Sequence, residues 1–234
     1  FLNDKLHLDV SASYIIQNTQ NMYRPGEYYN PLTAVYLFPR GEDWSAVQLY
    51  KRYDASRKFA TQYWPYGDQG MQLQNPYFIV NDMMTPTERK RYMFMSSLKY
   101  DILPWLNVTG RVRVDNTNTE SESRFHASGQ GILYAGTYGN GIYNHSQSID
   151  QQTYLDMMFN LDKSFGTDYR LTANLGASLE DYRSSGVGFG GPILKVPNLF
   201  SSAALDPVNA IPNDSEFRKR NTAVFASAEL SWKD

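Results

Sequence analysis

Polar and apolar side chains alternate with a period of two residues in six stretches of the chain. Because successive side chains of a β-strand point to opposite faces, this period predicts six long strands. The predicted strands are residues 5–18, 91–102, 105–119, 149–163, 168–183 and 217–233. Across them, one face is apolar at 30 of 34 positions and the other at 7 of 35. The fold is therefore expected to be all-β, with one apolar and one polar face.

The connections between these strands fall into two classes. The second and third strands are joined around Leu103 and Pro104, and the fourth and fifth by residues 163–168, where Gly166 can supply a positive φ. The other three connections are long, and an antiparallel up-and-down meander places all three at the same end of the sheet. They comprise residues 19–90, 120–148 and 184–215. Short periplasmic turns and long extracellular loops are typical of a transmembrane β-barrel.

A soluble β-sandwich also shows alternating strands, because its apolar face packs against a second sheet. The alternative prediction is therefore a soluble all-β binding or adhesion module. The two differ in what surrounds the apolar face, which is lipid in a barrel and protein in a sandwich. Leu98, Val112, Leu175 and Val224 lie on this face and distinguish the two.

Composition removes several classes of function. The net charge is −2, so the chain lacks the basic footprint of a nucleic-acid-binding protein. It contains no cysteine, which excludes disulfides, thiol catalysis and cysteine-type zinc sites. It has no apolar run long enough for a transmembrane helix.

The polar residues do not form a pattern typical of an enzyme. His7, His126 and His145 lie far apart and show no metal-ligand spacing. Glu180 and Asp181 are adjacent in a strand, so they point to opposite faces and cannot form an acid and base pair. We therefore expect no catalytic residue, no metal and no cofactor.

Three segments of the long connections suggest local structure. Residues 43–59 are predicted to form a short helix capped by Asp43, and residues 85–88 match a capping box that opens one helical turn. The glycine-rich residues 186–191 lack the Gly-Lys-Ser/Thr ending of a phosphate-binding loop, and we predict a mobile loop there.

Four stretches of the chain resemble the SusC/RagA-type TonB-dependent outer-membrane transporters. They read NPLTAVYLFPRG at 30–41, QNPYF at 74–78, LKYDI to WLNVTGR over 98–111, and FASAELSWK at 225–233. The resemblance implies a slice of a 22-stranded barrel without its plug, in the outer membrane of a Bacteroidetes-type bacterium. It also implies import of an oligosaccharide or peptide, captured with a SusD-like surface lipoprotein and energised by the TonB system.

In such transporters the long external loops meet the lipoprotein and the ligand. Aromatic side chains suit both tasks, since they stack on sugar rings and anchor protein interfaces. The alternative is that they pack the long segment 19–90 against itself. The candidates in this segment are Tyr36, Phe38, Trp44, Trp64, Tyr66 and Tyr77.

The polar face of the predicted sheet would line the lumen of a barrel. Its charged side chains would present a hydrated wall to a plug or solute. The alternative is that they form salt bridges between neighbouring strands. The predicted lumen-facing residues are Arg111, Arg113, Asp115, Asp156, Arg170 and Glu180.

Two basic triplets, 89–91 and 218–220, fall where strands descend from the long loops. In an outer membrane this is the level of the lipopolysaccharide phosphates, so outer-membrane lipid and lipopolysaccharide are predicted partners. The alternative is a solvated run of charge.

Overall fold

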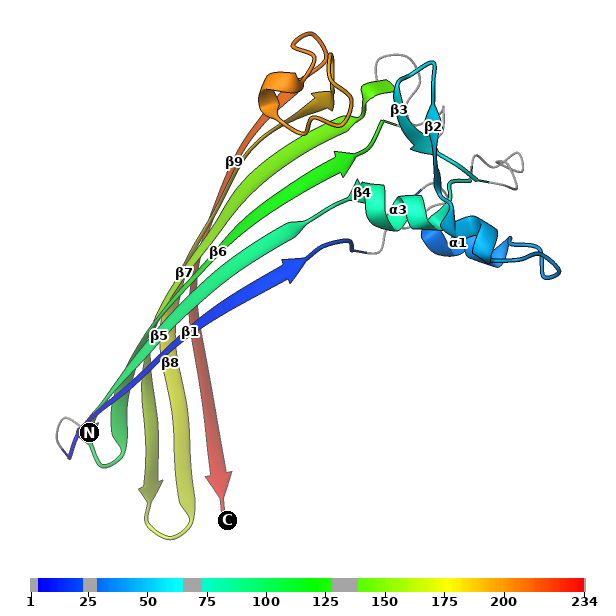
Figure 1. The fold of residues 1–234 in the computed structure, drawn as a ribbon. Coiled ribbons are helices and arrows are strands. Elements are labelled where there is room, and N and C mark those ends of the chain that lie inside the picture. Colours follow the sequence, from blue (N-terminus) through cyan, green and yellow to red (C-terminus); the bar gives the residue numbers. More distant parts are fainter. Residues whose placement is uncertain (1–3, 23–28, 65–72, 128–138, 234) are drawn as a thin grey trace.

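The computed structural model describes residues 4–22, 29–64, 73–127 and 139–233. Six long strands form one antiparallel sheet in which each strand pairs with the next along the path β1-β5-β6-β7-β8-β9. Their bounds are β1 Leu6–Thr19, β5 Thr87–Leu103, β6 Leu106–Phe125, β7 Ile142–Phe165, β8 Tyr169–Pro192 and β9 Ile211–Trp232. Figure 1 shows them side by side in an open, curved sheet. The predicted all-β meander is confirmed, and it matches a slice of a barrel wall.

Both predicted tight turns lie at the end of the sheet where the two chain ends are found (Figure 1). β5 and β6 are separated only by Pro104 and Trp105. β7 and β8 are joined by residues 166–168, and Gly166 has φ +65° as predicted. A glycine adopts this left-handed conformation without the steric cost that a Cβ would add.

The strands extend further toward the opposite end than the hydrophobic pattern predicted. β6 continues to Phe125, β7 begins at Ile142, β8 continues to Pro192 and β9 begins at Ile211. The connections that remain, residues 126–141 and 193–210, are shorter than the predicted 120–148 and 184–215. Backbone pairing continues in these extensions although most of their residues are polar or glycine, so the alternation of apolar and polar residues that marked the strands is weak there.

Two local predictions are corrected by these strands. Residues 186–191 are not a loop, because they lie in β8 and pair with β7 throughout. Residues 85–88 do not open a helical turn, because β5 begins at Thr87. In both cases the ladder hydrogen bonds of a long sheet outweigh a weak local turn preference.

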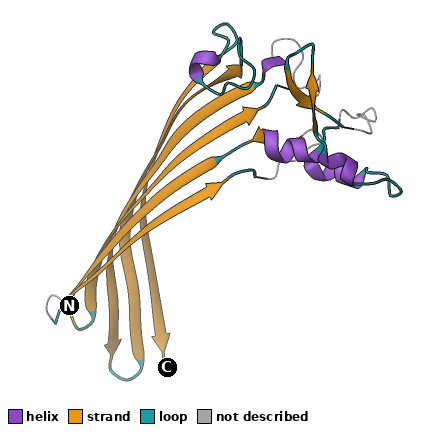
Figure 2. Ribbon diagram, in the orientation of Figure 1, coloured by secondary structure: helices purple, strands orange, loops and turns teal. Residues whose placement is uncertain are grey.

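Residues 29–86 include a small unit of helices and short strands at the far end of the sheet (Figure 2). Its elements are α1 Pro31–Tyr36, α2 Ser45–Gln48, β2 Lys51–Asp54, β3 Phe59–Gln62, α3 Pro76–Asp82 and β4 Met83–Met84. The helix predicted over 43–59 is reduced to α2, since the antiparallel β2–β3 hairpin takes up the rest. Asp43 accepts a hydrogen bond from the Ser45 backbone at 2.8 Å, although Trp44 and not Asp43 occupies the N-cap position of α2.

Both Asn-Pro pairs of the sequence begin helices of this unit. Asn30 and Asn75 each accept a hydrogen bond from the backbone N–H two residues later, at 3.0 and 2.9 Å, and each is followed by proline at the first helical turn. Asparagine at the cap and proline at the first position are both preferred there. None of the helices in the described ranges is long and apolar enough to cross a membrane.

Gly141 marks the entry into β7 and is held by close backbone contacts. Its φ is +103°, and a Cβ at this position would lie 2.7 Å from the carbonyl oxygen of Phe125. We expect Gly141→Ala to destabilise this region by more than about 1 kcal/mol, since both conformation and space exclude the methyl group. Thermal unfolding of the purified protein measures the loss. Gly41→Ala is the matched control, because a Cβ there meets no atom within 4 Å. Equal melting temperatures for the two variants would contradict the expectation.

Candidate functional site

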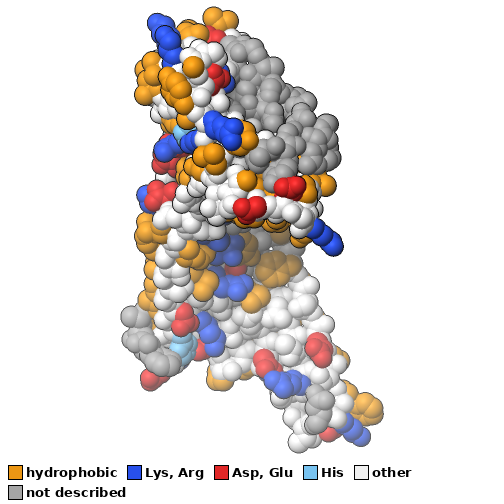
Figure 3. Space-filling model, turned by 45° about the vertical axis from the view of Figure 1, so that its right-hand side comes forward, with side chains coloured by type: hydrophobic (Ala, Val, Ile, Leu, Met, Phe, Trp, Pro, Cys, Tyr) orange, Lys and Arg blue, Asp and Glu red, His pale blue; other side chains and the backbone are white. Residues whose placement is uncertain are grey.

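The two faces of the sheet have opposite chemistry, as the alternation predicted. Apolar side chains of one face are largely uncovered, with Leu175 55% and Val224 80% exposed and Leu98 44% exposed. Within the described ranges the sheet path contains no second sheet packed on this face, because the other sheet is the short β2–β3 hairpin. Figure 3 shows charged side chains gathered in the hollow of the molecule and hydrophobic ones along its left margin.

The charged face is tied together by bridges between neighbouring strands. Arg111 and Asp156 are register partners with an ion pair of 2.9 Å, and the Asp156 side chain is fully buried. Asp115 pairs with Arg91 at 2.5 Å. Arg170 pairs with Asp162 at 2.6 Å. The alternative of mutual salt bridges is thus what the structure shows for four of the predicted lumen-facing residues.

The remaining two, Arg113 and Glu180, meet at Gln152. Arg113 donates to the Gln152 side-chain oxygen at 3.4 Å, and the Gln152 amide donates to Glu180. Glu180 also accepts from the Asn221 side chain at 2.9 Å. All six predicted residues therefore lie on one polar surface formed by β6, β7 and β8. Their contact with a solute or plug stays a prediction.

Four of the aromatic candidates in segment 19–90 lie in a small core. Phe38, Trp44 and Tyr77 pack against a buried cluster of Ala34, Val47 and Trp64. The Phe38 and Trp44 rings meet edge to face at 4.8 Å, and the Trp44 indole N–H donates to the Tyr77 hydroxyl at 3.2 Å. These positions show that the rings pack the segment against itself, which was the alternative prediction.

Tyr36 differs from these rings because it is 84% exposed. It lies at the end of α1 and is available to a partner or ligand. Tyr66 lies outside the described residues. Whether any of the six candidates contacts substrate or a partner protein stays a prediction.

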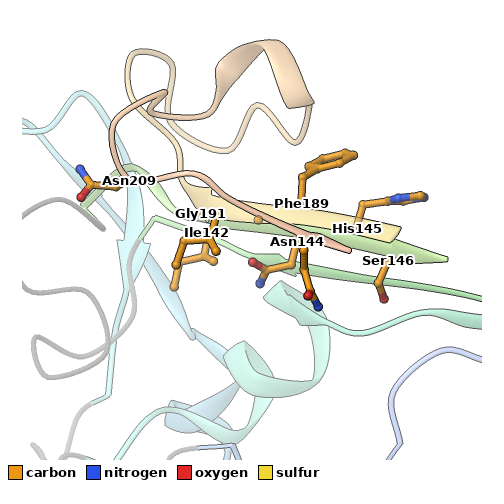
Figure 4. Close-up of a pocket in the computed structure, with 11 residues that line it drawn as sticks. Ile142, Asn144, His145, Ser146, Phe189, Gly191 and Asn209 are labelled. Atoms are coloured by element: carbon orange, nitrogen blue, oxygen red, sulfur yellow. The ribbon is translucent and has the colours of Figure 1, made fainter. Parts of the chain in front are cut away.

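A groove that was not predicted from the sequence lies at the end of β7, β8 and β9 opposite the tight turns (Figure 4). Its volume is about 470 Å³. The lining residues include Asn144 and Ser146 of β7, Gly188 and Gly190 of β8, and Asn213 of β9. In Figure 4 the side chains of Asn144 and Ser146 point away from those of His145 and Phe189. By strand alternation, Asn144 and Ser146 lie on the same face as Asp150 and Asp156.

The floor of the groove is backbone because glycine occupies every second position there. A Cβ on Gly190 would lie 1.9 Å from the Asn144 side-chain oxygen, and one on Gly188 would lie 3.0 Å from the carbonyl oxygen of His145. The register pairs Asn144 with Gly190, so the asparagine side chain occupies the space above the glycine. Glycine in a strand typically marks such a close approach.

The groove offers uncharged hydrogen-bonding groups. The Asn144 and Asn213 side-chain amides make no hydrogen bond to any described residue, whereas the Asn209 amide donates to Asp206 at 2.6 Å. This bond and the Val208 backbone N–H lower the pKa of the Asp206 carboxyl below its usual value. Free amides beside exposed backbone suit a neutral polar ligand such as a peptide backbone or sugar hydroxyls.

This groove was not predicted from the sequence because most of its lining residues are glycine, asparagine and serine, which form no recognisable motif along the chain. The alternate glycines 186, 188 and 190 were visible, yet they were interpreted as a loop. The signal that identifies them is their spacing of two residues, which places all three on one face of a strand. Among the described residues, no group of three or more metal-ligating side chains comes together.

Comparison with known proteins gives a likeness of fold. No protein-family model matches the chain, and no curated protein matches it. Solved structures do match. The "RagAB peptide importer in the 'open-open' state" aligns with a TM-score of 0.69 at 14% identity, covering 99% of this chain and 24% of that one. The "RagAB peptide transporter" aligns with a TM-score of 0.65 at 14% identity, covering 100% of this chain and 25% of that one. The "RagAB peptide importer in the 'closed-closed' state" aligns with a TM-score of 0.65 at 14% identity, covering 99% of this chain and 25% of that one. The chain thus spans about a quarter of these neighbours.

Proposed function

We propose that this chain forms part of the wall of an outer-membrane nutrient importer. The observation that carries the proposal is the uncovered apolar face of a sheet whose other face is charged and bridged. Leu175, Val224 and Leu230 are 55%, 80% and 67% exposed. In water such a face would be an aggregation hazard, whereas in a bilayer it is the surface that lipid requires.

The edges of the sheet support a larger barrel. Within the described residues, β1 pairs only with β5 and β9 pairs only with β8. A strand cannot leave its backbone N–H and C=O groups unpaired in hydrocarbon, so further strands must flank both edges in a membrane. We propose that these strands belong to the rest of a longer protein.

The external end supports capture of a solute. The aromatic unit of residues 29–86 and the groove between β7 and β9 lie at this end, beyond the apolar part of the sheet. The fold neighbours are described as importers or transporters of peptides. We propose that this protein takes up an oligosaccharide or peptide captured with a SusD-like surface lipoprotein, and that the TonB system supplies the energy. The soluble adhesion module requires protein over the apolar face, and the described residues supply none.

Fractionation of bacterial membranes tests the localisation. We expect the full-length protein to remain with the outer-membrane fraction in high salt and to be released only by detergent. A SusD-like lipoprotein should co-purify with it. Release as a monodisperse species without detergent would contradict the proposal.

Uptake assays on the same strain test the transport. Cells lacking the protein are expected to deplete either a peptide mixture or an oligosaccharide mixture more slowly than wild type. Restoration of the gene should return the rate, and removal of the TonB system should abolish it. Unchanged depletion of both mixtures would contradict import.

A further inference from the structure

Three arginines and one aspartate gather on the apolar face of β8 and β9, just beyond the continuous apolar rows that end at Leu179. Asp181 faces Arg220 in the strand register, and Arg183 faces Arg218. Counting by twos from Leu179 places these residues on the same face as Leu175 and Leu171. The cluster therefore lies on the face that contacts lipid according to the proposed function. This inference rests on the proposed function.

The cluster carries more positive than negative charge. Arg218 holds Asp181 with two hydrogen bonds, at 2.9 and 2.7 Å. Arg183 and Arg220 each reach the same carboxylate at 3.4 Å, so three guanidinium groups share one carboxylate and the set carries a formal charge of +2. The arginine side chains are 45–58% exposed, whereas Asp181 is 19% exposed. Most of their N–H donors therefore remain available.

Arg183 and Arg218 stand directly opposite each other, and like charges in this position destabilise a strand pair. The neighbouring positions on β7 in the same two rows are Thr153 and Gln151, which contribute no charge. Glu216, opposite Ser185, lies one row further from the apolar surface. An anion bound at the two rows that hold the arginines would relieve this repulsion. Guanidinium groups match a phosphate in particular, since each can donate two parallel hydrogen bonds.

The height of the cluster fits a lipid headgroup. The apolar stretch of β8 covers residues 169–179, which measures about 35 Å along a strand at ~3.4 Å per residue. A barrel strand is tilted by roughly 40°, so this stretch spans about 25 Å, the usual height of the lipid-facing band. The arginines follow immediately, on the side of the external segments.

Strand alternation separates the side chains of each basic triplet, 89–91 and 218–220, because the middle residue faces the opposite side of the sheet from the outer two. Lys219 lies between Arg218 and Arg220 but faces the opposite side of the strand. In the triplet 89–91, Lys90 pairs with Glu88 at 3.0 Å, and Arg91 pairs with Asp115 on the charged face. These pairs leave no comparable excess of positive charge on the apolar face. We infer that Arg183, Arg218 and Arg220 form a binding site for the phosphate group of an outer-leaflet lipid.

Native mass spectrometry of the detergent-purified, full-length protein tests the site. The probes are monophosphoryl lipid A, the same lipid without its phosphate, and inorganic phosphate. The double variant Arg183→Gln/Arg220→Gln removes the excess charge and leaves the Arg218–Asp181 pair intact. We expect this double variant to bind the phosphorylated lipid at least about tenfold more weakly than wild type does. The reason is that each basic residue near a membrane surface contributes substantially to the binding of anionic lipid.

Lys219→Gln is the matched control, because it removes one charge from the same strand on the opposite face. It should leave lipid binding unchanged, and Arg220→Gln alone should reduce it. Equal binding by the double variant and wild type, or equal loss in Lys219→Gln, would overturn the site. Binding of inorganic phosphate as tightly as the lipid would overturn the lipid as the ligand. If the protein still fractionates with the outer membrane in those cases, the proposed function is unaffected.

Discussion

Leu175→Arg is expected to destabilise the protein in a bilayer by about 2–4 kcal/mol, the cost of a basic side chain on the lipid face near the midplane. Leu175 lies near the middle of the apolar stretch of β8, with Phe159 and Ala226 as its register partners. Its side chain is 55% exposed within this chain, so lipid and not protein would surround it. Guanidinium unfolding of the full-length protein in phospholipid vesicles, followed by tryptophan fluorescence, measures the change.

The neighbouring Asn174→Arg is the matched control for this prediction. Asn174 points to the charged face, where its amide donates to Ser227 at 3.2 Å. Loss of this single hydrogen bond is expected to cost only about 1 kcal/mol, because an arginine there remains in water. A protein that folds in buffer without lipid and tolerates Leu175→Arg as well as Asn174→Arg would contradict the lipid-facing assignment.

Asn75→Ala is expected to destabilise the unit of helices and short strands within residues 29–86 by about 3–7 kcal/mol. The Asn75 side chain is fully buried, and it accepts from the Tyr77 backbone while donating to the carbonyl oxygens of Val47 and Tyr63 at 2.8 and 2.9 Å. Alanine removes the helix cap, worth about 1 kcal/mol, and leaves two carbonyl groups without their partner, at about 1–3 kcal/mol each. Hydrogen–deuterium exchange should therefore accelerate in residues 45–64 and 73–82.

Two further variants make this prediction specific. Asn30→Ala removes the equivalent cap of α1, whose bond to Leu32 is exposed, and should cost about 1 kcal/mol. Asn75→Asp keeps the cap acceptor but places a buried carboxylate oxygen against the two carbonyl oxygens, so it should destabilise the unit at least as much as Asn75→Ala. Exchange in β7 and β8 should stay unchanged in all three variants. If Asn75→Ala accelerated exchange no more than Asn30→Ala, the buried asparagine would not hold the unit together.

The central part of the sheet was predictable because one physical requirement governs it. A strand with apolar side chains on one face and polar ones on the other has a period that no other local structure shares. Turns around Pro104 and Gly166 were equally visible, since proline and glycine restrict or extend the allowed backbone angles. Salt bridges between neighbouring strands were one of the two alternatives predicted for the charged face, and Arg111–Asp156 and Arg170–Asp162 are two such bridges.

The end of the sheet opposite the tight turns could not be predicted in the same way. There most strand residues are polar or glycine and the alternation is weak, so the strand ends at Phe125, Ile142, Pro192 and Ile211 depend on backbone pairing with a neighbour. The groove at Asn144 and the glycines of β8 arises only when β7, β8 and β9 are aligned in register. The arginine cluster has the same origin, because Arg183 and Arg218 are 35 positions apart in sequence and opposite each other in the sheet.

The sequence by itself determined the antiparallel meander, its tight turns and the chemistry of its two faces, because these follow from side-chain alternation and from backbone angles available to single residues. Only the tertiary structure decided how far each strand extends, which aromatic rings become core, and which polar groups meet. Those outcomes depend on register between strands and on packing between distant segments. Both involve free energies shared among many residues, and no local pattern in the chain encodes them.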